Sequence, residues 1–273
     1  KHWFKLWVRE NLSIRQLSLF SGYSESKLKG VKNYWLEQNP AHPFNYGEIT
    51  HLVYDGTYFH KDGCLMVLMS ASNQMIVSSL YAAKEGTAQS SRWFSDLKEK
   101  GLNPFCITMD GEQQTMNIIQ TLWRGITIQR CLYHIQREGM RWLRSKPKTK
   151  AAQELRRLLT SLCGIQSIKE RIHFLQTYRI WLKTYRDYVY SLPMRIKANF
   201  DLKRTIALID NAIPNMFHYL MDSNIPPTSN MLEGFYSRLK LAYQLHRGLT
   251  QRHKIQFLKW YCYFENQQKI NNL

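Results

Sequence analysis

Hydrophobic and polar positions recur along the chain with periods that predict helices first, then strands, then helices again. In residues 1–38 apolar positions have helical spacing, and Ser13 and Ser24 are placed to cap two short helices around a tight turn at Ser21–Ser24. Two short helices joined by a glycine-containing turn are typical of a helix-turn-helix, the alternative being an ordinary helical hairpin. A linker with two prolines follows at residues 38–43.

The next segment is rich in β-branched and aromatic residues, which predicts strands. We expect an antiparallel meander in which a turn at residues 60–63 joins the first two strands. A helix ending at Gly101 should follow, and then a strand–helix–strand unit. The expected elements are strands at 49–59, 64–70 and 74–80, a helix at 87–100, a strand at 105–109, a helix at 112–123 and a strand at 126–130. This order is that of a ribonuclease-H-like sheet, whereas periodicity alone predicts only an α/β or α+β fold.

The rest of the chain is predicted to be helical. No strand is expected from residue 131 to about 221, and two prolines at 226 and 227 precede the last two helices, at 230–242 and 250–268. The predicted fold class is therefore α/β, a ribonuclease-H-like mixed sheet with an all-helical insertion and an N-terminal helix-turn-helix. The predicted regions are 1–47 (helix-turn-helix), 48–136 (first part of the core), 137–222 (basic helical insertion) and 223–273 (final part of the core).

Charge is distributed unevenly over these regions. The 273 residues have a formal net charge of +18, with +14 in residues 124–204 and −3 in residues 48–123. A strongly basic surface points to a polyanionic partner, either nucleic acid or an anionic membrane face. The acidic segment beside it would repel phosphates unless cations lie between them.

Other protein classes are excluded by simple features of the sequence. No run of about 18 apolar residues predicts a membrane span, and residues 1–20 have no signal-peptide pattern. The five cysteines are widely spaced and contain no Cys-x-x-Cys pair, which argues against a disulfide scaffold or a four-cysteine zinc site. A reducing cytoplasm is the expected compartment.

Three carboxylates are candidates for a catalytic site. Asp55 lies inside the first predicted strand, where Asp is disfavoured, although a β-bulge at this Asp-Gly pair would also explain it. Asp110 ends a strand and Glu233 lies in a helix, but each also fits a capping box, Asp110 with Gln113 and Glu233 with Asn230. Together, a strand-interior Asp, a strand-terminal Asp and a helical Glu are the ligands that a two-metal nuclease needs for its Mg²⁺ ions.

The helix that carries Glu233 is expected to have two different faces. Lys240 follows Glu233 by seven residues and shares its face, so the carboxylate and the base should point together toward the sheet edge or DNA. The opposite, apolar stripe consists of Met231, Phe235, Leu239 and Ala242.

Four short motifs resemble those of a known family. They are Val53–Tyr58 (VYDGTY), Thr108–Gly111 (TMDG), Gln129–His134 (QRCLYH) and Ser229–Glu233 (SNMLE), with Arg238 and Lys240 downstream. In their order and spacing they are similar to the DDE transposases, and specifically to the Mutator-like transposases of bacterial insertion sequences. The long interval between Asp110 and Glu233 resembles family members that carry a helical insertion there.

The resemblance implies an enzyme whose catalytic metal ligands are Asp55, Asp110 and Glu233, with Mg²⁺ as the cofactor and Mn²⁺ as a substitute. Such enzymes hydrolyse the phosphodiester at transposon ends and join the exposed 3′-OH groups to target DNA by transesterification. The implied partner is double-stranded DNA, comprising the terminal inverted repeats and the target, bound by a homodimer without any membrane. The implied location is the bacterial cytoplasm, associated with the nucleoid.

Further residues are expected to support the site or bind DNA. Cys131, His134, Arg238 and Lys240 are predicted accessory residues of the active site. The first two have the spacing of half a zinc site without a matching second pair, and the alternative is a buried Cys and a hydrogen-bonded His on a helix. The predicted DNA-binding residues are Lys27, Lys29, Arg141, Arg144, Lys146, Lys148 and Lys150, with solvated helix faces as the alternative for the basic clusters.

Two other functions fit the same motifs. The chain could be a domesticated or regulatory DNA-binding protein that keeps the fold without chemistry, or a nuclease that cuts without strand transfer. All three carboxylates are present, which favours the transposase, because a protein without the activity has no reason to keep them.

Overall fold

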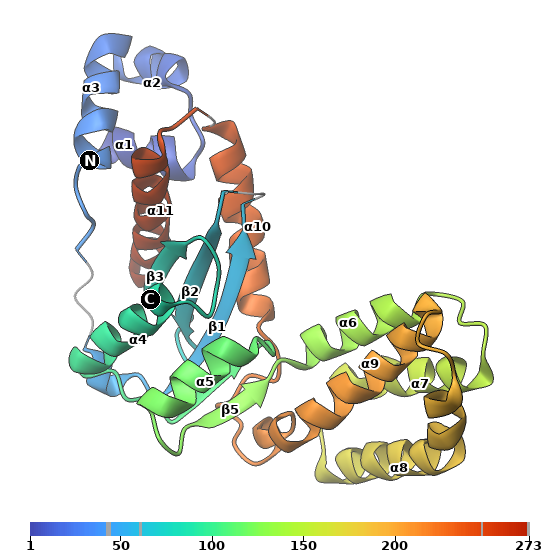
Figure 1. The fold of residues 1–273 in the computed structure, drawn as a ribbon. Helices are drawn as coiled ribbons and strands as arrows, with labels where there is room; N and C mark the ends of the chain where they lie inside the picture. Colours follow the sequence, from blue (N-terminus) through green and yellow to red (C-terminus); the bar gives the residue numbers. More distant parts are fainter. Residues whose placement is uncertain (42–44, 60–61, 247, 272–273) are drawn as a thin grey trace. The chain divides into compact units, whose positions relative to one another are not determined.

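The computed structural model describes residues 1–41, 45–59, 62–246 and 248–271. The predicted linker at 38–43 and turn at 60–63 therefore lie partly outside the described residues. The chain forms two compact units, each with its own internal contacts (Figure 1). The first unit contains residues 1–49, 55–103 and 231–273, and the second contains residues 50–54 and 104–230.

The predicted N-terminal helices are confirmed. They are α1 (His2–Arg9), α2 (Ile14–Ser21) and α3 (Glu25–Leu36). Ser13 and Gln16 form a reciprocal capping box at the start of α2, and Ser24 caps α3. Gly22 ends α2 with a φ of 71°, a conformation that glycine adopts without strain. Local capping chemistry is therefore enough to fix both ends of this turn.

The strands form one mixed sheet in the order β3-β2-β1-β4-β5. They are β1 (His51–Tyr58), β2 (Cys64–Ser70), β3 (Ile76–Ala82), β4 (Cys106–Met109) and β5 (Thr127–Arg130). β2 and β3 are antiparallel, whereas β4 is parallel to both β1 and β5. Each strand lies within two residues of its predicted bounds, and the predicted α/β class is confirmed.

Three further helices belong to the first unit. They are α4 (Ala88–Glu99), α10 (Asn230–Leu245) and α11 (Gln251–Asn271). The predicted stripe of α10 is buried except at its first position, where Leu232 is buried and Met231 is only half-buried. On α11, the amide of Asn266 accepts a hydrogen bond from the Ile76 N–H at 2.7 Å and donates one to the Ile76 carbonyl at 2.8 Å. The helix thereby satisfies part of the backbone of the edge strand β3.

The second unit is mainly helical, and residues 131–221, all described, contain no strand, as predicted. Its helices are α5 (Gln113–Leu122), α6 (Leu132–Leu143), α7 (Lys150–Ser161), α8 (Ile168–Ser191) and α9 (Lys197–Ala212). Helices α6 to α9 pack around a core that includes Leu155, Phe174, Trp181 and Ile206 (Figure 1). The long basic segment is therefore a folded helical layer with an apolar core of its own.

Candidate functional site

Asp55 lies in the middle of β1 and is 7% exposed. The Tyr236 hydroxyl on α10 donates a hydrogen bond to the Asp55 carbonyl at 2.6 Å, which ties the strand to the helix. Gly56 does not have a positive φ, and the strand continues through it. The alternative of a glycine-type bulge at this position is therefore wrong, because that bulge needs a left-handed glycine.

A second carboxylate, Glu85, lies beside Gly56, the residue after Asp55, in the first unit. A Cβ built on Gly56 would come within 1.8 Å of the Glu85 Oε1 atom. The Glu85 carboxylate therefore occupies space that is open only because residue 56 is a glycine. Burial raises the pKa of the Cys64 thiol, and the nearby charges of Glu85 and Asp55 raise it further, against an opposing effect of Lys240. Lys240 is thus close enough to act on the Cys64 thiol, and its accessory role stays a prediction. Glu85 lies in a loop and was not predicted, because its approach to Gly56 is a tertiary contact.

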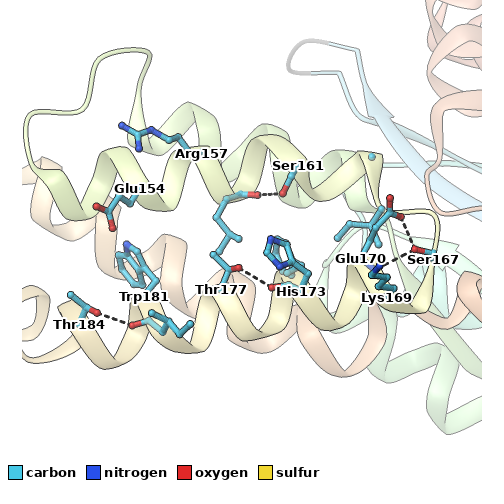
Figure 2. Close-up of a pocket in the computed structure, with 15 residues that line it drawn as sticks. Glu154, Arg157, Ser161, Ser167, Lys169, Glu170, His173, Thr177, Trp181 and Thr184 are labelled. Carbon is cyan, nitrogen blue, oxygen red and sulfur yellow. Dashed lines mark hydrogen bonds between the residues drawn. The ribbon is translucent and has the colours of Figure 1, made fainter.

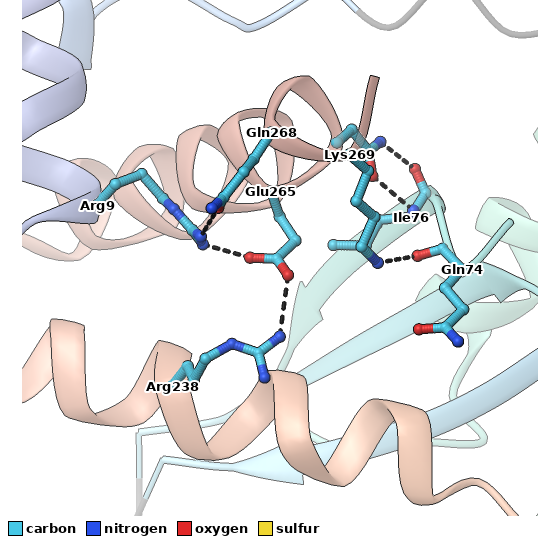
Figure 3. A network of polar contacts seen from close by, with 8 residues as sticks. Arg9, Gln74, Ile76, Arg238, Glu265, Gln268 and Lys269 are labelled. Atoms are coloured by element: carbon cyan, nitrogen blue, oxygen red, sulfur yellow. Dashed lines mark hydrogen bonds and ion pairs between the residues drawn. The ribbon is translucent and has the colours of Figure 1, made fainter. Parts of the chain in front are cut away.

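Glu233 lies in the first turn of α10 and is half-buried. Arg238, a predicted accessory residue on the same helix, bonds at 2.9 Å to the buried carboxylate of Glu265 on α11 (Figure 3). The other oxygen of Glu265 pairs with Arg9 of α1. Arg238 therefore links α10 to α11 and α1, an interaction that the sequence did not predict.

Asp110 follows β4 in the second unit. One of its oxygens accepts a hydrogen bond from the Glu112 N–H at 3.0 Å. The following helix α5 is capped by Glu112, whose carboxylate accepts from the N–H groups of Gln114 and Thr115. The predicted alternative of an Asp110–Gln113 capping box is therefore wrong, because Glu112 occupies the cap position and satisfies these N–H groups.

Arg130, at the end of β5, is a site residue that sequence reasoning missed. It is 7% exposed, and a Cβ on Gly111 would lie 2.0 Å from its terminal nitrogen, so the guanidinium packs directly on the residue after Asp110. Burial lowers the pKa of Arg130, while the negative charge of Asp110 opposes that shift. Its Nε has no hydrogen-bond partner among the described residues. A buried cation with an unused donor beside a carboxylate is suited to bind an anion there. The one feature of the sequence that pointed to Arg130 was its position directly before the Cys-x-x-His motif.

Cys131 and His134 are brought together through Ser229. The buried Cys131 sulfur lies 3.3 Å from the Ser229 N–H and 3.4 Å from its hydroxyl, which is itself 3.4 Å from the His134 Nδ1 atom. Burial raises the pKa of the Cys131 thiol, with a smaller opposing effect from the Ser229 hydrogen bonds. A neutral buried thiol is a poor metal ligand and nucleophile. The geometry matches the alternative of a buried Cys and a hydrogen-bonded His, joined here to the residue before α10.

The parallel pairing of β1 and β4 relates two of the three predicted carboxylates. Val53 pairs with Thr108, and Asp55 and Asp110 each follow these partners by two residues. Within each unit, counting only the residues that the structure describes, no three His, Cys, Asp or Glu side chains are close enough to hold a metal ion together. The predicted ligands are divided between the units, with Asp55 and Glu233 in the first and Asp110 in the second.

Some of the predicted DNA-binding residues already pair with acidic or aromatic side chains of the chain itself. Lys29 pairs with Glu25, Arg141 with Glu138, and Lys150 with Glu154. The Lys27 ammonium lies 3.9 Å from the centre of the Tyr23 ring. The whole set, Lys27, Lys29, Arg141, Arg144, Lys146, Lys148 and Lys150, is exposed on α3, on α6 and its following loop, and at the start of α7.

The close packing of Arg130 on Gly111 predicts a measurable cost for a small substitution. Gly111→Ala should force Arg130 out of its position and destabilise the protein by about 1–3 kcal/mol, as overpacking typically does. Gly30→Ala on α3 is the matched control, because a Cβ there meets nothing within 4 Å. In the helix interior it should stabilise by about 0.5–1 kcal/mol. Urea unfolding of both variants checks this, and equal midpoints would show that Arg130 yields without cost.

Part of the chain is similar to a known protein family. Residues 67–193 match the family described as "Transposase, Mutator family". The motifs predicted the same family, and the match supports that resemblance. The match covers somewhat less than half of the chain. It includes Asp110, Arg130, Cys131 and His134 and ends near the end of α8.

A comparison with curated proteins found no match. Among the described residues, no helix is long and apolar enough to cross a membrane.

Proposed function

We propose that this protein is a DDE transposase that cleaves transposon ends and joins their 3′-OH groups to target DNA, with Asp55, Asp110 and Glu233 as its metal ligands. The observation that carries the proposal is the register of β1 and β4. In parallel paired strands, residues equally far past a paired couple lie at the same end of the sheet, which favours a joint role for Asp55 and Asp110. The mixed five-stranded order also supports a ribonuclease-H-like core.

The donor chemistry fits Mg²⁺ better than zinc. The three candidate ligands offer only carboxylate oxygens, which Mg²⁺ and Mn²⁺ prefer, whereas the nearby thiol of Cys131 is held neutral by burial. When bound, the metal ions would polarise the phosphodiester and lower the pKa of the attacking water. The chain itself holds Asp110 through the Glu112 N–H and places the Arg130 guanidinium next to it. That cation offsets the negative charge of Asp110 and of an incoming phosphate.

The test of this function is direct. Purified protein is incubated with candidate transposon-end duplexes and Mg²⁺ or Mn²⁺, and nicked and joined products are separated on denaturing gels. Nicking together with end joining supports the proposal. Nicking without joined products identifies a nuclease instead, and binding without either product identifies a regulatory DNA-binding protein.

The N-terminal helices are proposed to read the end sequence as a helix-turn-helix. Helix α3 buries only Leu28 and Leu36, which leaves Lys27, Lys29 and Asn33 exposed on its outer side. Such a face can enter the major groove, where phosphate contacts fix its register. We propose that it acts within a homodimer that pairs two ends.

We expect Lys27→Gln together with Lys29→Gln to weaken binding of end DNA about tenfold and to reduce the preference for end sequence over random duplex. The charge-matched control is Lys169→Gln with Lys183→Gln on α8. Deleting residues 1–43 is a poor test, because Phe4 and Trp7 of α1 pack on the rings of Trp260 and Phe257 in α11. Competition binding with end and random duplexes measures the preference, and an unchanged preference would contradict the assignment of α3.

A further inference from the structure

A polar pocket of about 390 Å³ lies between the α6–α7 loop and α7, within the second unit. Three cationic side chains line it, Lys146 from the loop and Arg156 and Arg157 from α7. Among the described residues that line it there is no carboxylate, and the other polar groups are those of Ser145, Gln153 and Thr160. Hydroxyl, amide and cationic donors without an opposing acid are the groups that bind an oxyanion.

The pocket is built rather than formed by mobile surface charges. The Arg156 guanidinium donates one hydrogen bond to the Met140 carbonyl at 2.8 Å, which fixes its position against α6. Gln153 donates to the Pro147 carbonyl at 3.0 Å and so fastens the loop to α7. Since the loop and guanidinium are held before a ligand arrives, little ordering has to occur on binding.

The basic residues next to the pocket form ion pairs, whereas the described basic residues that line the pocket do not. Arg141 and Lys150, on either side of the loop, pair with Glu138 and Glu154. None of the ion pairs found among the described residues involves Lys146, Arg156 or Arg157. The pocket therefore concentrates positive charge that the fold itself does not neutralise.

Arg157 lines this pocket and also a second cavity. A groove of about 990 Å³ lies between α7 and α8 and is lined on its floor by apolar residues such as Phe174 and Trp181. Figure 2 shows Arg157 on the side of α7 away from α8, while Trp181 and His173 face the groove from α8. The groove is lined by the carboxylates of Glu154 and Glu170 as well as by cations, whereas the described lining of the polar pocket has no carboxylate.

We propose that this pocket is a dedicated binding site for a backbone phosphate of double-stranded DNA, and that it anchors the helical layer on the duplex. The assignment rests on the proposed function, because only a DNA-processing role makes duplex DNA the relevant source of phosphate. A site of this kind contacts the backbone and carries no base information, so it adds affinity equally for all sequences.

The experiment compares two charge-matched triple variants of the full chain. Lys146→Gln, Arg156→Gln and Arg157→Gln remove the pocket's cations, whereas Lys169→Gln, Arg179→Gln and Lys183→Gln remove three exposed cations of α8. Binding of a random 20-base-pair duplex is followed by fluorescence anisotropy at several salt concentrations. The pocket triple should lose at least about tenfold in affinity at 100 mM salt and flatten the plot of log K against log salt by roughly 0.9 for each lost phosphate contact. The α8 triple should lose no more than about threefold.

Equal losses in the two triples would overturn the proposal, since they would show a general electrostatic effect. Lys146→Glu alone, in an exposed loop position that leaves the helical core intact, should reproduce most of the loss even if the triple variant folds poorly. Inorganic phosphate is the third probe. If 10 mM phosphate raises the melting temperature of the wild type but not of the pocket triple, while both bind DNA equally, the pocket takes a free anion and the DNA assignment is wrong.

Cleavage separates this proposal from the function on which it rests. Nicking of end DNA by the wild type tests the proposed function by itself, because the pocket contains none of the proposed metal ligands. One outcome is that the wild type fails to nick under every condition while the pocket triple binds DNA more weakly than the α8 triple. In that case the proposed function is wrong and the phosphate site is supported. If nicking is normal and binding is unaffected, only the phosphate site fails.

Discussion

Replacing Asp55 or Asp110 with Asn, or Glu233 with Gln, should lower Mg²⁺-dependent cleavage of end DNA by about 10³-fold or more, while affinity for the DNA stays within a few-fold of wild type. Each substitution removes a charged metal ligand but keeps the size of the side chain. A two-metal site stabilises both the attacking and the leaving oxygen, so losing one ligand weakens the whole arrangement. A loss of 10³-fold corresponds to about 4 kcal/mol of transition-state stabilisation.

The matched control is Asp96→Asn, which removes a carboxylate that pairs with Lys100 on the exposed side of α4. Its cleavage rate should be unchanged. Single-turnover nicking assays at saturating DNA measure the chemical step, and anisotropy on the same duplex measures binding. If one of the three variants nicks at a near-normal rate, that residue is not a metal ligand, whatever the other two show.

The elements that the sequence predicted well are those fixed by local chemistry. Ser13, Ser24 and Thr87 each cap the helix that begins after them, because their hydroxyls reach N–H groups only three residues away. The alternating or continuous apolar runs of the strands also need no distant partner to be recognised. Cys64–Ser70 was predicted with the bounds that the structure gives.

Where two local signals compete, the sequence was ambiguous and one alternative was wrong. Asp110 and Glu112 both precede α5 and both could cap it. Glu112 does so, because its longer side chain reaches the N–H groups of Gln114 and Thr115, which leaves Asp110 bonded only to the Glu112 N–H. The outcome removes the capping box with Gln113 as an explanation for Asp110, and its role as a metal ligand stays a prediction.

The parts of the site that sequence could not reveal depend on contacts between distant segments. Glu85 approaches Gly56 from a loop about thirty residues away, and Ser229 meets Cys131 across about a hundred residues. Nothing in the local pattern of a loop Glu or a Ser after two prolines predicts such a partner. Arg130 was visible within a motif, but its burial against Gly111 needed the strand pairing of β4 and β5.

Glu265→Gln should lower the free energy of unfolding by about 3 kcal/mol, a large effect for a residue outside the proposed catalytic set. The Glu265 carboxylate is nearly buried between Arg9 of α1 and Arg238 of α10 (Figure 3). Arg9 is also largely buried, and its guanidinium lies 4.7 Å from the ring centre of Tyr261. Removing one partner of a buried pair leaves an uncompensated charge, which typically costs about 3–5 kcal/mol.

The exposed pair of Glu25 and Lys29 on α3 provides the control. Glu25→Gln should change the unfolding free energy by at most about 0.5 kcal/mol, because water already screens that pair. Urea unfolding of the three proteins at pH 7 measures both differences. The change in unfolding free energy for Glu265→Gln could be no larger than that for Glu25→Gln. This result would show that the cost of desolvating the Glu265 carboxylate cancels its attraction to the two arginines.

The pH dependence of the Glu265 effect follows from its charges. Burial alone would raise the pKa of Glu265, but the guanidiniums of Arg9 and Arg238 outweigh it and hold the pKa below the ordinary value of 4.5. A carboxyl group with a lowered folded-state pKa stabilises the protein above its unfolded-state pKa, and this contribution is lost as the pH falls through the folded-state value. The destabilisation by Glu265→Gln should therefore be constant from pH 8 to about pH 5 and should shrink below that range. A difference that grows on acidification would mean that Glu265 is protonated more easily in the folded protein, and that the two arginines do not control its charge.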